Sequence, residues 1–225
     1  MFTKNSDFDE TIKKEWPSPV MYDGITNMEQ YKNSNPKILW ILKETNENGN
    51  GEDRNHREFH ENVTVYAYWK RTYKKIILST YGLINNVSFS DMLFFANDKN
   101  LCGHYDILNQ IAFINVNKTG ATSQSKNCYI SKYYQKHKDT LLTQVDEIAP
   151  DVIINCSRVG AFFDDLSEHY NLTKQVKKTT DNWIINYANN GKKLLIDYWH
   201  PNAKIEDDWY CTQIIDIYNN WKSNQ

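Results

Sequence analysis

Four continuous apolar runs, each followed by polar residues, organise the chain. They cover residues 38–42, 111–118, 151–156 and 193–198. A parallel strand that is covered on both faces reads as an unbroken apolar run, so each of these stretches predicts a buried strand. Residues 183–187 are a candidate for an extra strand, because Asn189-Asn190-Gly191 makes a good turn into the last run.

Between these runs, apolar residues recur three or four positions apart, which is the spacing of one helix face. This pattern covers residues 8–14, 58–81, 128–148, 159–166 and 206–221. Gly82 is expected to close the second of these helices, and Ser157 to cap the fourth. The alternation predicts a three-layer α/β/α sandwich with a central, mostly parallel four-stranded sheet. Residues 1–35 are interpreted as an N-terminal arm packed on a single α/β domain of residues 36–225.

Charge and composition restrict the partners that the protein can take. A chain of 225 residues with 40% hydrophobic residues fits one globular domain. The formal net charge of −2 provides no global basic field, so any contact with a polyanion needs a local patch. The helix over 58–81 carries such a basic cluster, made of Lys70, Arg71, Lys74 and Lys75. We interpret this cluster as a solvated face in preference to a phosphate contact.

No cofactor, metal or membrane contact is expected. The four cysteines lie far apart and form no C-x-x-C pair. His56 and His60, with Glu58 and Glu61 nearby, have no spacing that specifies one metal. The N-terminus lacks the apolar core of a signal peptide, and no run approaches the roughly 20 apolar residues of a membrane span. A cytoplasmic protein is therefore expected.

Polar residues with possible chemistry follow three of the predicted strands. Glu44 and Asn46 follow the first run, Asn115 and Asn117 end the second, and His200 follows the last. Ligands of open α/β sheets bind just beyond the carboxyl ends of the strands, so we expect these residues to face one cleft. Each has a simpler reading: the loop residues solvate a turn, the strand amides satisfy backbone groups, and the histidine is structural.

The order of these motifs resembles the uracil-DNA glycosylase superfamily. The segments that carry the resemblance are Leu42-Lys43-Glu44-Thr45-Asn46, Phe113-Ile114-Asn115-Val116-Asn117-Lys118 and His200-Pro201-Asn202, with residues 142–154 between them. In that family the first loop holds a water-positioning residue, a later strand ends in an Asn that reads the base, and the last strand ends in His-Pro. The resemblance spans roughly residues 37 to 203.

This resemblance implies an enzyme that hydrolyses the N-glycosidic bond of uracil or another modified base in DNA. Bond breaking creates an oxocarbenium-like sugar and an anionic base, which need negative charge near the sugar and a donor at the base oxygen. Glu44, Asn46 and His200 would be the catalytic residues. Asn115 would bind the base edge, with Phe59 or Tyr66 stacking on it. The residues expected at the DNA phosphates are Lys118, Thr119, Ser123 and Asn202.

Two alternatives stay open. Lys43 and Asn46 occupy places where the family's first loop has Gly and Pro, which favours a catalytically inactive nucleic-acid- or nucleobase-binding protein of the same fold. An unrelated α/β enzyme that acts on a small nucleotide is the second alternative. In the glycosylase reading the partner is single- or double-stranded DNA, no metal takes part, and the protein is a monomer.

Overall fold

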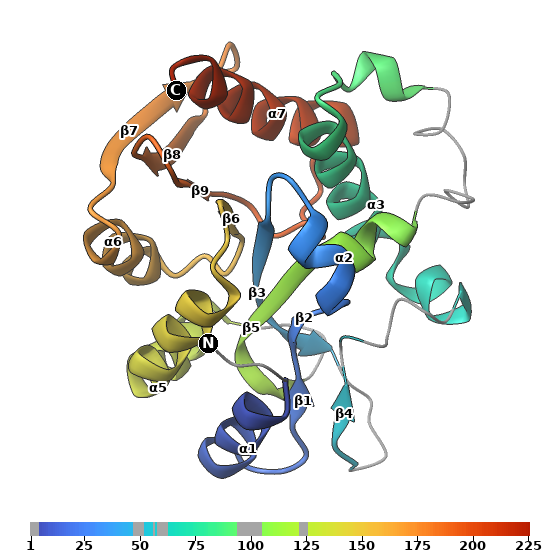
Figure 1. Cartoon of the computed structure of the whole chain (residues 1–225), viewed down its shortest axis with the longest axis vertical. Helices are drawn as coiled ribbons and strands as arrows, with labels where there is room; N and C mark the ends of the chain where they lie inside the picture. The colour runs from blue at the N-terminus through green and yellow to red at the C-terminus, as the bar shows by residue number, and fades with distance from the viewer. Residues whose placement is uncertain (1–4, 47–51, 56, 58–62, 94–104, 122–125) are drawn as a thin grey trace.

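The computed structural model describes residues 5–46, 52–55, 57, 63–93, 105–121 and 126–225. Its centre is a seven-stranded mixed sheet in the order β2-β5-β3-β6-β9-β8-β7 (Figure 1). Four parallel strands form the middle: β3 (Ile38–Asn46), β5 (Ile111–Ala121), β6 (Val152–Asn155) and β9 (Leu194–Asp197). These strands match the four apolar runs of the sequence.

Three further strands, joined by antiparallel pairings, complete the sheet, so the prediction of a four-stranded, mostly parallel sheet is wrong. They are β2 (Gly24–Ile25) beside β5, and β8 (Ile184–Asn189) and β7 (Thr173–Lys178) beyond β9. β8 corresponds to the extra strand suggested by the sequence. β7 gave no signal because it is a mostly polar edge strand, and β2 gave none because it has only two residues.

Helices cover both faces of the sheet. On one face, α3 (Val63–Asn85) and α7 (Asp207–Ser223) pack on Ile38, Trp40 and Leu42 of β3. On the other face, α5 (Asn127–Ile148) and α6 (Gly160–His169) pack on Leu39 and Ile41. The alternation along β3 sends successive side chains to opposite cores. Figure 1 shows α5 and α6 on one side of the strands and α3 and α7 on the other.

Gly82 does not end its helix, contrary to the expectation from the sequence. Helix α3 runs through this residue to Asn85. A Cβ atom at Gly82 would lie 2.5 Å from Ile215 Cδ1 of α7, so the glycine permits close helix packing. Ser157 also lies before the helix start, and the N-cap residue of α6 is Val159.

The N-terminal residues contribute small elements around the main sheet. They form α1 (Asn5–Glu15), β1 (Met21–Tyr22), the sheet strand β2 and α2 (Met28–Asn33). β1 pairs with β4 (Arg54–Asn55) in a separate two-stranded sheet. Two short 3₁₀ helices cover residues Ser90–Met92 and Tyr105–Gln110. Within the described ranges, no helix combines the length and apolarity needed to cross a bilayer.

Candidate functional site

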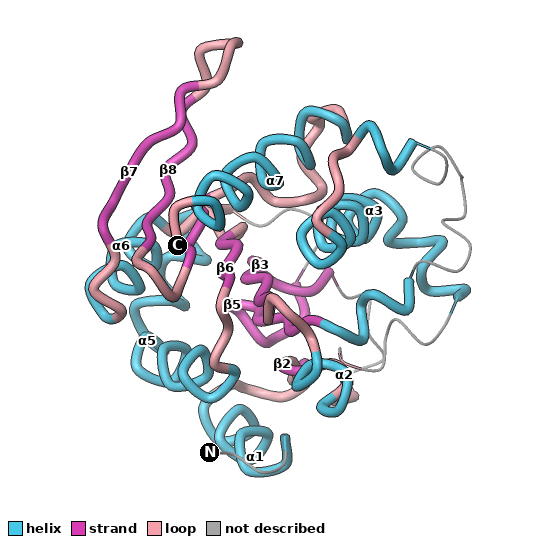
Figure 2. Tube along the Cα trace, turned by 45° about the horizontal axis from the view of Figure 1, so that its top comes forward, coloured by secondary structure: helices cyan, strands magenta, loops and turns pink. Residues whose placement is uncertain are grey.

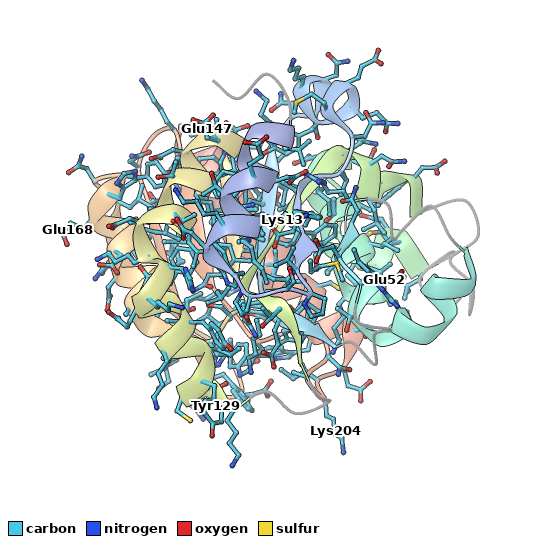
Figure 3. The ribbon with its side chains drawn as sticks, turned by 90° about the horizontal axis from the view of Figure 1, so that it is seen from below. Lys13, Glu52, Tyr129, Glu147, Glu168 and Lys204 are labelled. Atoms are coloured by element: carbon cyan, nitrogen blue, oxygen red, sulfur yellow. The ribbon has the colours of Figure 1, made fainter. Side chains whose placement is uncertain are left out.

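The candidate site lies where the strand order changes direction. β3 is the first parallel strand along the chain, β5 joins it on one side and β6 on the other. The crevice at such a switch point is where open α/β sheets bind ligands. In Figure 3, Tyr129 near the start of α5 and Lys204 beyond β9 lie at one end of the molecule, opposite Glu147 near the far end of α5. The carboxyl ends of the parallel strands face that first end.

Glu44 and Asn117 meet at the ends of β3 and β5. The parallel register places Glu44 opposite Asn117 and Leu42 opposite Asn115. Asn117 Nδ2 donates to Glu44 Oε2 at 3.0 Å, and Asn117 Oδ1 accepts from the N–H and hydroxyl of Thr119 at 3.1 and 2.8 Å. The amide therefore orients the carboxylate. Thr119, which was expected at a phosphate, donates both its backbone N–H and its hydroxyl to Asn117.

Asn115 is almost completely buried at the same strand end, with 1% of its surface exposed. Its backbone N–H donates to Asp23 Oδ2 at 2.7 Å. Because residues two apart on a strand share a face, the side chains of Asn115 and Asn117 lie on the side of the sheet that α3 covers. The base-binding role of Asn115 stays a prediction, and this position is compatible with it.

Lys118 is fully buried, which contradicts its expected contact with DNA phosphate. Its ammonium lies 2.7 and 2.9 Å from the two carboxylate oxygens of Asp23 and 2.8 Å from Gln144 Oε1. Gln144 Nε2 also donates to Asp23, at 2.8 Å. Burial lowers the pKa of Lys118, and the charge of Asp23 opposes that shift. The residue thus links β5 and α5 to the N-terminal segment.

The other predicted site residues fall into two groups. Phe59 and Ser123 lie outside the described residues, and so do the side chains of Asn46 at the end of β3 and Tyr66 in α3. Asn202 is exposed, and its backbone N–H contacts the ring of His200. The predicted roles of these five residues stay predictions.

His200 lies just beyond β9 and is held as a neutral ring. The backbone N–H of Asn202 donates to His200 Nδ1 at 3.2 Å, so the neutral ring carries its hydrogen on Nε2. Burial, followed by the charges of Lys43 and Lys75, lowers the pKa of His200 to about 4. At neutral pH the ring is therefore an uncharged donor through Nε2.

Two basic residues of α3 position the loop that contains His200. Lys75 is buried, and its ammonium donates to the carbonyl of Ala203 at 2.7 Å and lies 4.9 Å from the ring centroid of Tyr210. Lys74 forms an ion pair with Asp207 at 2.8 Å. For these two lysines, the solvated-face interpretation is wrong, because Lys74 pairs with the first residue of α7 and Lys75 binds the loop that precedes α7.

The end of β6 adds a second polar group. Asn155 Nδ2 donates to Asp197 Oδ1 at 3.0 Å, and Asn155 Oδ1 accepts from the hydroxyl of Ser157 at 2.6 Å. Burial raises the pKa of Asp197 to about 6, against the opposing charge of Arg158. Arg158 has a positive φ of 62° and places its guanidinium 5.8 Å from the ring centroid of Trp199.

Lys43 connects the two halves of the site. It precedes Glu44 in β3, and its ammonium donates to Asn127 Oδ1 of α5 at 2.8 Å. Burial, then the charge of Arg158, lowers the pKa of Lys43, and Lys43 in turn lowers the pKa of His200. The sequence analysis assigned no role to Arg158 or Asp197, and it interpreted Lys75 as part of a solvated face. Arg158 and Asp197 each end or follow a predicted strand, and that position was the available signal.

One cavity of about 340 Å³ lies at another place in the fold. It is bounded by β7, the β8–β9 turn and the end of α7, and amide side chains dominate its lining. The cavity lies near Gly191, just before β9 begins, so it is at the amino ends of the parallel strands and the candidate site is at their carboxyl ends. The switch-point site is therefore defined by its side-chain contacts and not by this cavity.

Comparison with known proteins adds no family assignment. No model of a known protein family matches the chain. A search of curated proteins also finds no match. The chemistry of the site consequently has to be argued from its own residues.

Proposed function

We propose that the protein is a DNA glycosylase-like enzyme, which hydrolyses the N-glycosidic bond of uracil or another modified base in DNA. The observation that carries the proposal is the state of His200, a neutral ring whose Nδ1 is occupied and whose Nε2 is a donor. A neutral donor suits a base oxygen that gains negative charge as the bond breaks. It stabilises the leaving base without first having to lose a proton.

Glu44 supplies the complementary charge. Its carboxylate, oriented by Asn117, would stabilise the oxocarbenium-like sugar and position the attacking water. Asn115 would recognise the base, since an amide both donates and accepts. No metal is required for this chemistry, and the described residues contain no cluster of three or more metal-ligating side chains.

The test is cleavage of a uracil-containing oligonucleotide. Removal of one transition-state donor or charge typically costs about 10²–10³ in rate, so Glu44→Gln and His200→Ala should each lower the single-turnover rate by at least about 10²-fold. Asn115→Ala should weaken discrimination between uracil and thymine. Matched controls are Glu168→Gln and His169→Ala, which change exposed residues of α6 and should leave the rate unchanged.

Two results would contradict the proposal. If the wild-type protein cleaves no uracil-containing or other modified-base substrate, the activity is wrong. If it cleaves, but Glu44→Gln and His200→Ala cleave at the wild-type rate, the site is wrong.

A binding protein of the same fold is the second candidate, and Lys43 favours it. A side chain that reaches Asn127 stands where the resembling family has a glycine, so the carboxyl end of β3 is bulkier than a glycine would make it. This candidate predicts that DNA with and without uracil is bound, with an affinity that falls as salt rises, and that neither is cleaved. Titrations at two salt concentrations, run beside the cleavage assay, distinguish the two functions.

A further inference from the structure

Three tryptophans from three elements gather beside the His200 loop. Trp183 precedes β8, Trp199 precedes His200, and Trp209 belongs to α7. The ring centroids of Trp183 and Trp199 are 5.2 Å apart, those of Trp199 and Trp209 5.6 Å, and those of Trp183 and Trp209 6.1 Å. All three pairs meet edge to face, at interplanar angles of 61–78°. The cluster is thus a compact group of rings.

The outer ring of this cluster is unusually exposed. Trp183 keeps 49% of its surface accessible, and its neighbour Ile184 keeps 63%. Both belong to the β7–β8 hairpin, which extends beyond the helices that cover the sheet (Figure 2). Because Trp183 adjoins two further rings, its exposed ring is a candidate contact surface for a partner.

Trp183 is nevertheless held in place. Its backbone N–H donates to Thr179 Oγ1 at 3.1 Å, and its carbonyl accepts from the Thr179 N–H at 2.9 Å. Trp209 Nε1 donates to Asp181 Oδ2 at 3.0 Å, which ties the hairpin turn to α7. These bonds hold the backbone of Trp183, and its contacts with Trp199 and Trp209 hold the ring. A ring held in place loses little conformational entropy when a ligand stacks on it.

Positive charge borders the rings on the side of the candidate site. The guanidinium of Arg158 lies 5.8 Å from the centroid of Trp199. Lys43 and Arg158 interact electrostatically, and the charges of Lys43 and Lys75 reach His200. Aromatic faces beside cations suit a ligand that alternates flat bases with phosphates. The net charge of −2 means that stacking, more than an extended phosphate track, has to supply the affinity.

We propose that the Trp183–Trp199–Trp209 cluster is a stacking platform for unpaired bases of single-stranded DNA that flank the nucleotide at His200. Only unpaired bases offer their faces, because in a duplex the neighbouring base pairs cover them. The inference rests on the proposed function and makes it more specific: the substrate is single-stranded DNA, or a duplex opened around the target base.

The experiment measures binding of a fluorescently labelled 12-nucleotide thymidine oligonucleotide at fixed salt. Stacking on one aromatic ring is worth about 1–3 kcal/mol, so Trp183→Ala should weaken binding by about 5- to 150-fold. Trp183→Phe keeps a ring and should recover most of the affinity. Ile184→Ala, which removes an even more exposed apolar side chain from the same hairpin, should bind as the wild type does. None of the three variants should change the weaker binding of a fully paired duplex.

Several outcomes would overturn the inference. These are absent binding of the oligonucleotide, equal affinities of wild type and Trp183→Ala, or a loss in Trp183→Ala that is as large for the duplex. A dimer that Trp183→Ala dissociates, in the absence of DNA binding, would assign the rings to self-association. Thermal melts of each variant show whether the fold is retained.

Cleavage is read separately from binding. If binding depends on Trp183 but no DNA is cleaved, the proposed glycosylase activity is refuted and the stacking platform is supported. If Trp183→Ala binds and cleaves single-stranded DNA as the wild type does, the stacking platform is refuted and the enzyme is supported.

Discussion

At the scale of single residues, Lys118 shows how a polar strand end can serve the fold. Its position after an apolar run suggested an exposed contact, yet it lies in a buried network with Asp23 and Gln144. Removing one partner of a buried ion pair leaves an uncompensated charge, which is costly, whereas removing both is often tolerated. Asn115 lies on the same strand, β5, and its backbone N–H also binds Asp23, so the network fixes part of the candidate site.

The first prediction concerns this network. Lys118→Met should lower the free energy of unfolding by about 3–5 kcal/mol, because it leaves the buried carboxylate of Asp23 unpaired. Adding Asp23→Asn should recover part of that loss, since the isolated charge disappears. Urea unfolding of both single variants and the double variant measures the coupling. Lys204→Met, at an exposed lysine (Figure 3), is the control that should change little.

A double variant no more stable than Lys118→Met would contradict this account. The lysine would then contribute through its packing on Trp16, whose ring centroid lies 5.5 Å from the ammonium.

At the scale of elements, helix α3 links the core to the loop that contains His200. Its inner face packs on α7 in the core, and Lys75 holds the carbonyl of Ala203. The close approach of the two helices depends on Gly82, which lies under Ile215. A shift between α3 and α7 would therefore move Lys75 relative to the carbonyl of Ala203, and this contact positions the His200 loop.

Gly82→Ala is the prediction at this scale. Alanine normally improves a helix interior by up to about 1 kcal/mol, but here the added methyl group would lie 2.5 Å from Ile215 Cδ1 and 3.2 Å from the carbonyl oxygen of Val87. Overpacking of this kind costs about 1–3 kcal/mol, so the net effect should be destabilising. Gly160→Ala, at a helical glycine with nothing within 4 Å of the added atom, should be neutral or stabilising.

Thermal unfolding of the two variants side by side decides this point. Equal melting temperatures would mean that Ile215 moves aside without cost. The close packing would then not be what requires a glycine in α3.

At the scale of the whole molecule, the sequence predicted the parallel centre of the sheet but not its edges. The runs that became β3, β5, β6 and β9 are buried on both faces, so burial alone makes them readable. β7 and β2 depend on neighbouring strands for their conformation, and their local composition carries no strand signal. The strand ends with Glu44, Asn115 and His200 were likewise readable from position. The partners of Lys75 and Lys118 lie 128 and 95 residues away, and such contacts leave no local pattern.

The stability of the whole molecule should depend on pH through two partly buried groups that act in opposite directions. The pKa of His200 falls from 6.5 to about 4, so between these values the unfolded state holds a proton that the native state lacks, and stability rises with pH. The pKa of Asp197 rises from 3.8 to about 6, so between these values the native state holds the extra proton, and stability falls with pH. The two contributions offset each other around pH 5.

Single substitutions should expose each contribution. With His200→Gln, the slope of the unfolding free energy against pH, measured in urea from pH 4.5 to 5.5, should become more negative than in the wild type. With Asp197→Asn it should become more positive. Each change is at most about 1.4 kcal/mol per pH unit, the value for one whole proton. Because the two variants are predicted to move the same slope in opposite directions, a shift of both slopes in one direction would show that the two groups do not titrate in this way.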